Sequence, residues 1–184
     1  FLPHIIFAQY QELEFESLTR DEGLSETSVT CMLQDKEGFI WFATETGVSR
    51  FDGTKFTNFT TATGLPDNEI INLFVDSKNR VWMIPFKNKI CYYKEGKIST
   101  SENDSFLRSI NLKSNITSIS EDRNGNIALT EMTKINILST SGKTKEIVSI
   151  NKRNISINNS GIDTAGNFQF LLHDGFSANS LGIY

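Results

Sequence analysis

Residues 35–44 run DKEGFIWFAT and place a tight turn directly before an apolar strand. Asp35, at the first turn position, can accept hydrogen bonds from the backbone two residues further on, and Gly38, at the fourth, can adopt positive φ at little cost. The run Phe39–Phe42 shows no alternation of apolar and polar residues. A strand without alternation is buried on both faces, so this segment belongs to a sheet packed between two neighbours.

The same segment recurs along the chain. Gly23-Leu24-Ser25 returns 41 residues later as Gly64-Leu65-Pro66, and the same step relates Asp35 to Asp76 and Trp41 to Trp82. Two fainter copies follow. Asp122 lies 46 residues after Asp76, and Asp163 lies 41 residues after Asp122. A period of this length with several strands in each unit is typical of a propeller blade.

The strands of each unit are expected in a fixed order, with four strands in each of the first three units and three in the last. The expected strands are 29–34, 39–44, 47–51 and 55–60, then 70–75, 81–84, 89–93 and 97–100, then 116–121, 127–130, 134–138 and 145–150, then 157–162, 168–172 and 181–184. The fold class is therefore all-β, a β-propeller of four-stranded blades with about four blades here, as part of a larger ring. The blade repeats are 20–60, 61–107, 108–153 and 154–184, and a strand at 13–19 completes another blade.

The repeated polar and aromatic residues have structural roles in this scheme. Trp41 and Trp82 pack blade against blade, and the turn residues reverse the chain between first and second strands. Those turn residues are Asp35, Gly38, Asp76, Asn79, Asp122, Gly125, Asp163 and Gly166. Four acidic residues at matched positions also suggest calcium, but the turns explain all four without a metal.

The composition of the chain and the positions of its Cys and His residues argue against nucleic-acid binding and against a zinc site. The chain has 184 residues and a net charge of −4, without the basic surface that binds nucleic acid. Twenty Ile and 14 Phe against six Ala favour strands over helices. Cys31 and Cys91 are 60 positions apart, and His4 and His173 are the sole histidines. Zinc needs about four ligands at local spacing, so no zinc site is expected. The two cysteines are interpreted as buried free thiols. No cofactor is expected.

The first unit resembles the two-component regulator propeller repeat. The resemblance covers residues 13–100 well and weakens beyond them, where Ala128 and Gln169 occupy the tryptophan position. The residues that carry it are Gly23-Leu24-Ser25, Val29, Gln34-Asp35, Gly38–Thr44, Gly47-Val48, Arg50-Phe51-Asp52-Gly53 and Phe56.

This resemblance implies the periplasmic or extracellular region of a bacterial membrane sensor. Such proteins carry a signal peptide, many blades, one transmembrane helix and a signalling output that is commonly a histidine kinase, and their ligands are often glycans. Residues 1–8 form an apolar run that ends at Ala8 and resembles the tail of a signal peptide; the alternative is an edge strand. The expected partners are a small ligand such as an oligosaccharide, further blades and signalling domains of the same chain, and a second copy of the chain.

The candidate ligand-binding residues lie on loops at one face. Loops that join fourth to first strands and second to third strands share a face of a propeller, and binding residues concentrate on such loops. The candidates are Arg20, Glu26, Glu45, Asn68, Lys87, Asn88 and Glu131.

A second hypothesis stays open at this point. Sixteen strands, counting 13–19, would close a four-bladed ring, which is the lower end of the propeller range. The chain would then be a secreted carbohydrate-binding protein or a glycoside hydrolase. A hydrolase needs two carboxyl groups in spatial proximity, and Glu45 and Glu131 are the candidates.

Overall fold

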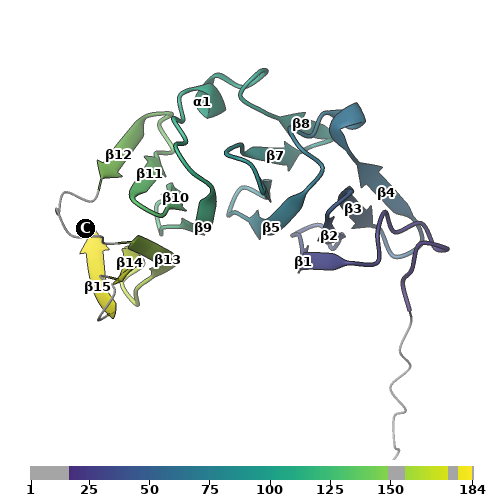
Figure 1. The fold of residues 1–184 in the computed structure, drawn as a ribbon, viewed down its shortest axis with the longest axis horizontal. Coiled ribbons are helices and arrows are strands. Elements are labelled where there is room, and N and C mark those ends of the chain that lie inside the picture. The colour runs from purple at the N-terminus through teal and green to yellow at the C-terminus, as the bar shows by residue number, and fades with distance from the viewer. Residues whose placement is uncertain (1–16, 149–155, 174–177, 184) are drawn as a thin grey trace, which may run out of the picture.

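A computed structural model describes residues 17–148, 156–173 and 178–183, and it contains four antiparallel sheets side by side in an arc (Figure 1). Blade 1 comprises β1 (Val29–Gln34), β2 (Ile40–Thr44), β3 (Gly47–Phe51) and β4 (Phe56–Phe59). Blade 2 comprises β5 (Ile70–Val75), β6 (Val81–Pro85), β7 (Cys91–Lys94) and β8 (Lys97–Ser99). Blade 3 comprises β9 (Ile116–Glu121), β10 (Ile127–Glu131), β11 (Lys134–Leu138) and β12 (Thr144–Val148).

Blade 4 has three strands in the described residues: β13 (Ser156–Ile162), β14 (Phe168–His173) and β15 (Ala178–Ile183). In every blade the strands pair in sequence order. The all-β propeller prediction is therefore confirmed. The predicted segment 1–8 and residues 13–16 of the predicted strand 13–19 lie outside the described residues, and residues 17–19 are not in a strand.

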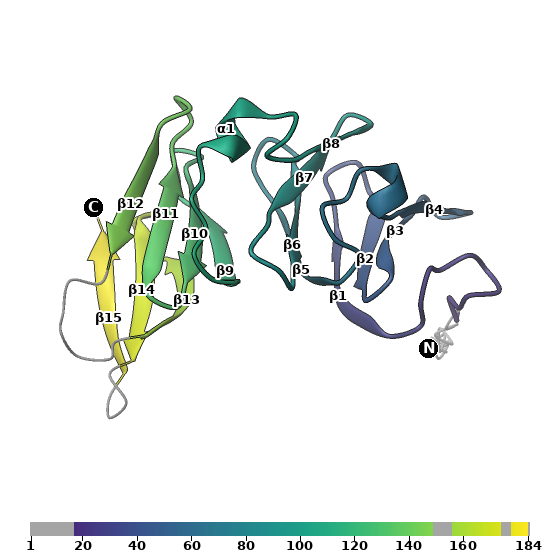
Figure 2. The same ribbon diagram turned by 45° about the horizontal axis from the view of Figure 1, so that its top comes forward.

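The four blades follow one another along an open arc, with blade 1 and blade 4 at its opposite ends (Figures 1 and 2). The inner strands of consecutive blades contact each other, as β1 does with β5 and β9 with β13. The described blades therefore do not close a four-bladed ring.

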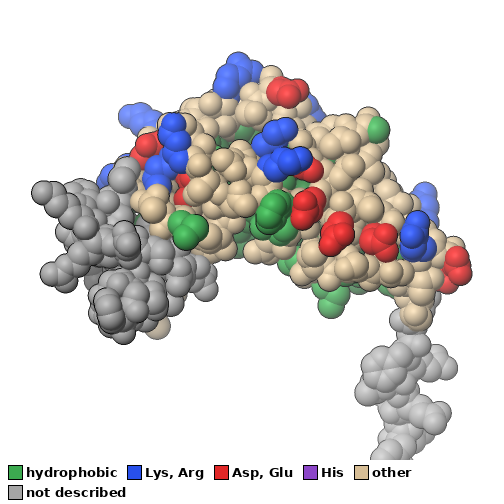
Figure 3. Space-filling model, viewed as in Figure 1, with side chains coloured by type: hydrophobic (Ala, Val, Ile, Leu, Met, Phe, Trp, Pro, Cys, Tyr) green, Lys and Arg blue, Asp and Glu red, His purple; other side chains and the backbone are tan. Residues whose placement is uncertain are grey.

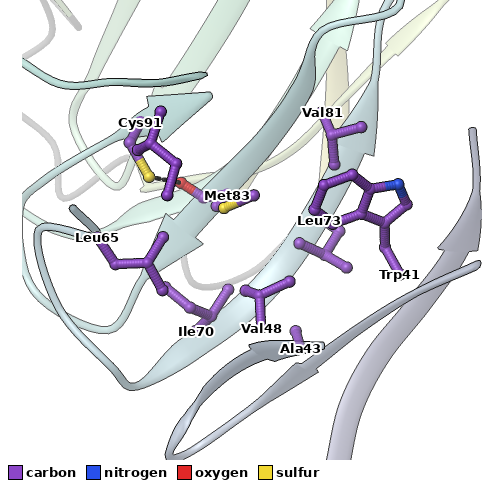
Figure 4. Close-up of a cluster of buried hydrophobic side chains, with 10 residues drawn as sticks. Trp41, Ala43, Val48, Leu65, Ile70, Leu73, Val81, Met83 and Cys91 are labelled. Atoms are coloured by element: carbon purple, nitrogen blue, oxygen red, sulfur yellow. Dashed lines mark hydrogen bonds between the residues drawn. The ribbon is translucent and has the colours of Figure 1, made fainter. Parts of the chain in front are cut away.

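Apolar side chains fill the space between consecutive blades. Trp41, Ala43 and Val48 of blade 1 pack against residues of blade 2 such as Leu73 and Met83 (Figure 4). Trp82 of blade 2 takes the corresponding place against blade 3, with Ile84, Ile127 and Leu129. Both tryptophan side chains are fully buried. Because a blade buries both faces of its second strand, β2 and β6 carry long apolar runs.

Two short helices lie in the connections between blades. The 3₁₀ helix η1 (Thr61–Thr63) precedes β5, and α1 (Ser105–Arg108) lies between β8 and β9 at the outer rim of the arc (Figure 1). Neither was predicted from the sequence.

The first-to-second-strand turns are hydrogen-bonded from blade to blade. The Lys36 amide donates to Asn79 Oδ1 at 3.0 Å, the Ser77 amide to Glu121 Oε2 at 2.7 Å, and the Arg123 amide to the Gly166 carbonyl at 3.0 Å. These contacts run along one end of the blades, which we call the turn face, and they leave the opposite end to the longer loops.

Candidate functional site

The candidate site is the loop face, the end of the blades opposite the turn face. Antiparallel pairing brings the loops after second strands and before first strands to this same end. In the described residues the loop face comprises 17–28, 45–46, 60–69, 86–90, 100–115 and 132–133. All seven predicted ligand-binding residues lie on it or at its edge.

The loop before β1 positions Arg20 and Glu26. Their side chains form an ion pair at 3.6 Å, with 65% of the Arg20 side chain exposed. Glu26 Oε1 also accepts a hydrogen bond from the Thr27 amide at 2.7 Å. Hydrogen bonds from Thr27, with the Arg20 charge as a smaller cause, hold the pKa of Glu26 below its ordinary value. Glu26 therefore presents a charged acceptor at the surface.

Blade 2 brings two of its loops together. Lys87 Nζ lies 2.7 Å from Asp67 Oδ2, which joins loop 86–90 to loop 60–69. This contact holds the pKa of Asp67 below its ordinary value and raises that of Lys87. Asn68 Oδ1 accepts from the Thr61 amide at 2.7 Å, and Asn88 Nδ2 donates to the Lys113 carbonyl at 3.4 Å. The Lys87 side chain remains 69% exposed, so it is accessible to a ligand.

Glu131 is buried, which contradicts its predicted role in ligand binding. Its Oε2 accepts hydrogen bonds from the amides of Lys113 and Ser114 at 2.7 and 2.6 Å. Its Oε1 accepts from Asn136 Nδ2 at 2.8 Å and lies 3.4 Å from Lys134 Nζ. An unpaired buried carboxylate is very costly, so these partners are what permit its burial. Glu131 therefore fixes the 100–115 connection, whereas Glu45 is exposed in the β2–β3 loop.

Two apolar side chains project from this face at equivalent positions of consecutive blades. Phe86 directly follows β6 and is 52% exposed, and Met132 directly follows β10 and is 55% exposed. The predicted site did not include them. The signal was present in the sequence, because the 46-residue step that relates Asp76 to Asp122 also relates Phe86 to Met132.

A cavity of about 180 Å³ opens beside loop 86–90. It is lined by Asn88, Lys89, Ile90, Ser101, Leu107, Ile110, Asn111 and Leu112. Asn88 is the one predicted residue in its wall. Phe86, Lys87 and Asn88 therefore place an aromatic ring, an amine and an amide on three consecutive residues of the loop beside this cavity.

Neither sign of charge dominates the surface of the arc on the face that Figure 3 shows. Acidic and basic side chains are interspersed there. Within the described residues no group of three or more His, Cys, Asp and Glu is arranged to hold a metal ion. Cys31 and Cys91 are both free, with Cys91 buried and Cys31 partly exposed.

The comparisons with known proteins agree with the predicted family at blade 1. Residues 23–46 match the model of the two component regulator propeller. Over 56 residues the chain is 41% identical to Histidine kinase P4 of Formosa agariphila, covering 30% of this chain and 4% of that protein. The resemblance predicted from the sequence is therefore confirmed for this repeat.

Solved structures show the same fold. The extracellular domain of a hybrid two component system from B. thetaiotaomicron superposes with a TM-score of 0.69 at 22% identity, over 88% of this chain and 23% of that one. A streptogramin B lyase superposes with a TM-score of 0.62 at 17% identity, over 88% of this chain and 56% of that one. The chain spans less than a quarter of the two-component structure. Among the helices of the described residues, none has the length and apolar character to cross a membrane.

Proposed function

We propose that this chain is the ligand-sensing propeller region of a two-component receptor and acts outside the cytoplasm. The observation that carries the proposal is the match of residues 23–46 to the two component regulator propeller. The similarity in fold to extracellular domains of two-component systems supports it. The partners are a small ligand, further blades and signalling domains of a longer chain, and a second copy of the chain.

The ligand-binding surface is loop 86–90 with its neighbours on the loop face. Phe86 offers an exposed ring, Lys87 a largely exposed amine and Asn88 an amide at the mouth of a cavity. An aromatic ring beside hydrogen-bonding groups suits an oligosaccharide, whose rings have apolar faces and hydroxyl edges. The ion pair between Lys87 and Asp67 holds this loop in place before the ligand arrives.

The region itself binds without catalysis in this proposal. A hydrolytic pair of Glu45 and Glu131 requires two carboxyl groups that reach the substrate, and Glu131 is fully buried. Ligand binding instead favours one arrangement of the receptor over another, and the output domain responds to that shift in population.

Binding of oligosaccharides to the chain tests this proposal. Immobilised chain is screened against an array of plant and animal oligosaccharides, and hits are quantified by titration calorimetry. The triple variant Phe86→Ala, Lys87→Ala, Asn88→Ala should lose at least tenfold in affinity while its melting temperature stays close to that of the parent, because these side chains are mostly exposed.

A matched control alters the turn face. Glu95→Gln with Lys97→Gln changes two exposed residues of the β7–β8 hairpin and should leave the affinity unchanged. Absence of binding to every oligosaccharide, or equal affinity of the triple variant and the parent, would contradict the proposal.

A further inference from the structure

A second cavity lies under α1 at the rim of the arc. Blades 2 and 3 are joined by residues 100–115, and α1 sits between the two blades there (Figures 1 and 2). Asp104 caps this helix, since its Oδ1 accepts from the amides of Phe106 and Leu107 at 2.8 and 3.2 Å. Leu107 is buried between the blades. The cavity therefore has walls from both blades and from α1.

The cavity has a volume of about 240 Å³ and a mixed lining. Blade 2 contributes Lys78, Arg80 and Tyr92, the α1 segment contributes Asp104 and Phe106, and blade 3 contributes the rest. The residues from blade 3 are Gly125, Leu138, Ser139, Thr140 and Gly142. Lys78 and the β11–β12 turn place most of the lining at the turn face. None of these residues lines the cavity beside loop 86–90, so the two cavities are distinct.

The charged groups around the cavity balance one another. Arg80 Nε lies 2.5 Å from Asp76 Oδ2, and its guanidinium stacks 4.8 Å from the ring centroid of Trp82 and 5.3 Å from that of Tyr92. The Tyr92 hydroxyl donates to Asp104 Oδ2 at 2.5 Å. The wall thus carries the cations Lys78 and Arg80 and the carboxylate of Asp104, and the buried Asp76 neutralises Arg80 from behind. The carboxylate of Asp104 in the wall disfavours an anionic ligand.

These walls offer both kinds of hydrogen-bonding group and two aromatic rings. The Lys78 amine donates and the Asp104 carboxylate accepts. The Tyr92 hydroxyl, whose proton goes to Asp104, can accept, and the hydroxyls of Ser139 and Thr140 can do either. Tyr92 and Phe106 add apolar ring surface. The volume lies just below the range of about 300–1,000 Å³ typical of drug-sized ligands, so it suits one ring.

We propose that this cavity binds a single neutral sugar ring, either a free monosaccharide or one residue of an oligosaccharide. The proposal goes beyond the sensing proposal and does not depend on it, because this cavity shares no lining residue with the cavity beside loop 86–90. A ligand here would contact blade 2, α1 and blade 3 at once, and would stabilise their relative placement.

Ligand-observed NMR on the chain tests the site with four probes: glucose, galactose, N-acetylglucosamine and inorganic phosphate. We expect saturation transfer to at least one sugar and none to phosphate. In ¹⁵N-labelled protein the amide signals of Phe106, Thr140 and Gly142 should shift on titration, while that of Asn88 stays in place. Shifts confined to loop 86–90 would overturn this site and leave the sensing proposal standing.

Two conservative variants test the contacts. Tyr92→Phe removes one hydroxyl, and Asp104→Asn removes the charge but keeps a side chain that caps helices well. Each should weaken sugar binding about three- to tenfold, which is the range for losing one hydrogen bond. Tyr93→Phe, which removes a hydroxyl on the neighbouring residue that contacts Arg50 instead, is the matched control and should leave the affinity unchanged. Transfer to none of the sugars, transfer to phosphate alone, or unchanged affinity in both variants would overturn the proposal.

Discussion

At the scale of single residues, the turn aspartates do more than close turns. Asp35 Oδ1 accepts from the amides of Glu37 and Phe39 at 2.9 and 3.1 Å, and its Oδ2 accepts from Trp41 Nε1 at 2.7 Å. Asp76 holds Trp82 Nε1 in the same way at 2.8 Å. An Asp six residues before a Trp therefore links the turn to the indole that packs between two blades. This spacing of six residues is visible in the sequence.

The third and fourth blades lack the tryptophan and use a different donor. Asn126 Nδ2 donates to Asp122 Oδ2 at 2.7 Å, and Asn167 Nδ2 to Asp163 Oδ2 at 3.3 Å. An asparagine four residues after the Asp thus takes the place of the indole N–H. The turn survives in these blades, where the family pattern has faded, because the carboxylate still has partners for both oxygens.

Removing a turn carboxylate should therefore cost more in blade 1 than in blade 3. Asp35→Ala leaves the buried indole N–H of Trp41 without its acceptor, and we expect a loss of about 2–4 kcal/mol in the free energy of unfolding. Asp122→Ala is the control, because its partner Asn126 lies nearer the surface and can turn to water, and should cost about 1 kcal/mol. Urea denaturation of both variants gives the comparison. Equal losses would show that the Asp–Trp contact adds no stability.

The two thiols should differ in reactivity. Burial raises the pKa of the Cys91 thiol, and the thiolate is the reactive form, so Cys91 should resist alkylation in the folded protein. Cys31 is partly exposed and should react first. Iodoacetamide labelling at pH 8 followed by peptide mass spectrometry should find Cys91 modified only after denaturation. Cys31→Ser provides the control, and rapid labelling of this variant under native conditions would refute the assignment.

At the scale of elements, the start of β3 depends on a glycine that the chain approaches closely. Gly47 has φ of 142°, and a Cβ there would lie 2.2 Å from the carbonyl oxygen of Phe59 in β4. Real Cβ atoms do not come this close to a backbone oxygen, so a side chain at this position must force β3 and β4 apart.

Gly47→Ala should accordingly destabilise blade 1 by more than about 3 kcal/mol, through backbone strain and loss of the β3–β4 pairing. Gly53→Ala is a matched control, because Gly53 also has positive φ, 96°, but nothing lies within 4 Å of its Cβ position. It should cost about 1–2 kcal/mol, the penalty of the left-handed conformation alone. Thermal denaturation of the two variants measures the difference, and similar melting temperatures would contradict the steric explanation.

The strands were predictable from the sequence, while α1 was not. Each Asp turn fixes the end of a first strand and the start of a second, so β1, β5 and β9 begin and end where the sequence predicts. The four residues of α1 are too few for a 3.6-residue period to appear. The one sequence signal for the insertion was the step of 46 residues, rather than 41, between Asp76 and Asp122.

At the scale of the whole molecule, the loop face was predictable from connectivity, but the state of each side chain on it was not. Lys87 and Asn88 are accessible as expected, because loop 86–90 extends beyond the blade. Glu131 was grouped with Glu45 because each lies at the end of a second strand. It is nine residues after Asp122, whereas Glu45 is ten after Asp35, so it matches the buried Thr44 and is itself buried. The physical reason is Lys134, whose amine is also buried and accompanies Glu131 three residues away. A buried ion pair of this kind depends on packing from the 100–115 connection, which no local pattern revealed.

The arc also determines how the molecule should unfold. Within the described residues each blade packs only on its neighbours, as the units of repeat proteins do. Weakening the interface between two blades should therefore lower the stability of the blades beside that interface more than that of the distant blades. Leu107→Ala removes a fully buried side chain between blades 2 and 3 and should cost about 2–5 kcal/mol. Hydrogen exchange followed by mass spectrometry should show residues 116–148 losing protection before residues 29–59. Leu65→Ala, in the cluster between blades 1 and 2, should reverse that order. If both variants lose protection evenly along the chain, the blades unfold as one cooperative unit and the nearest-neighbour description of the arc is wrong.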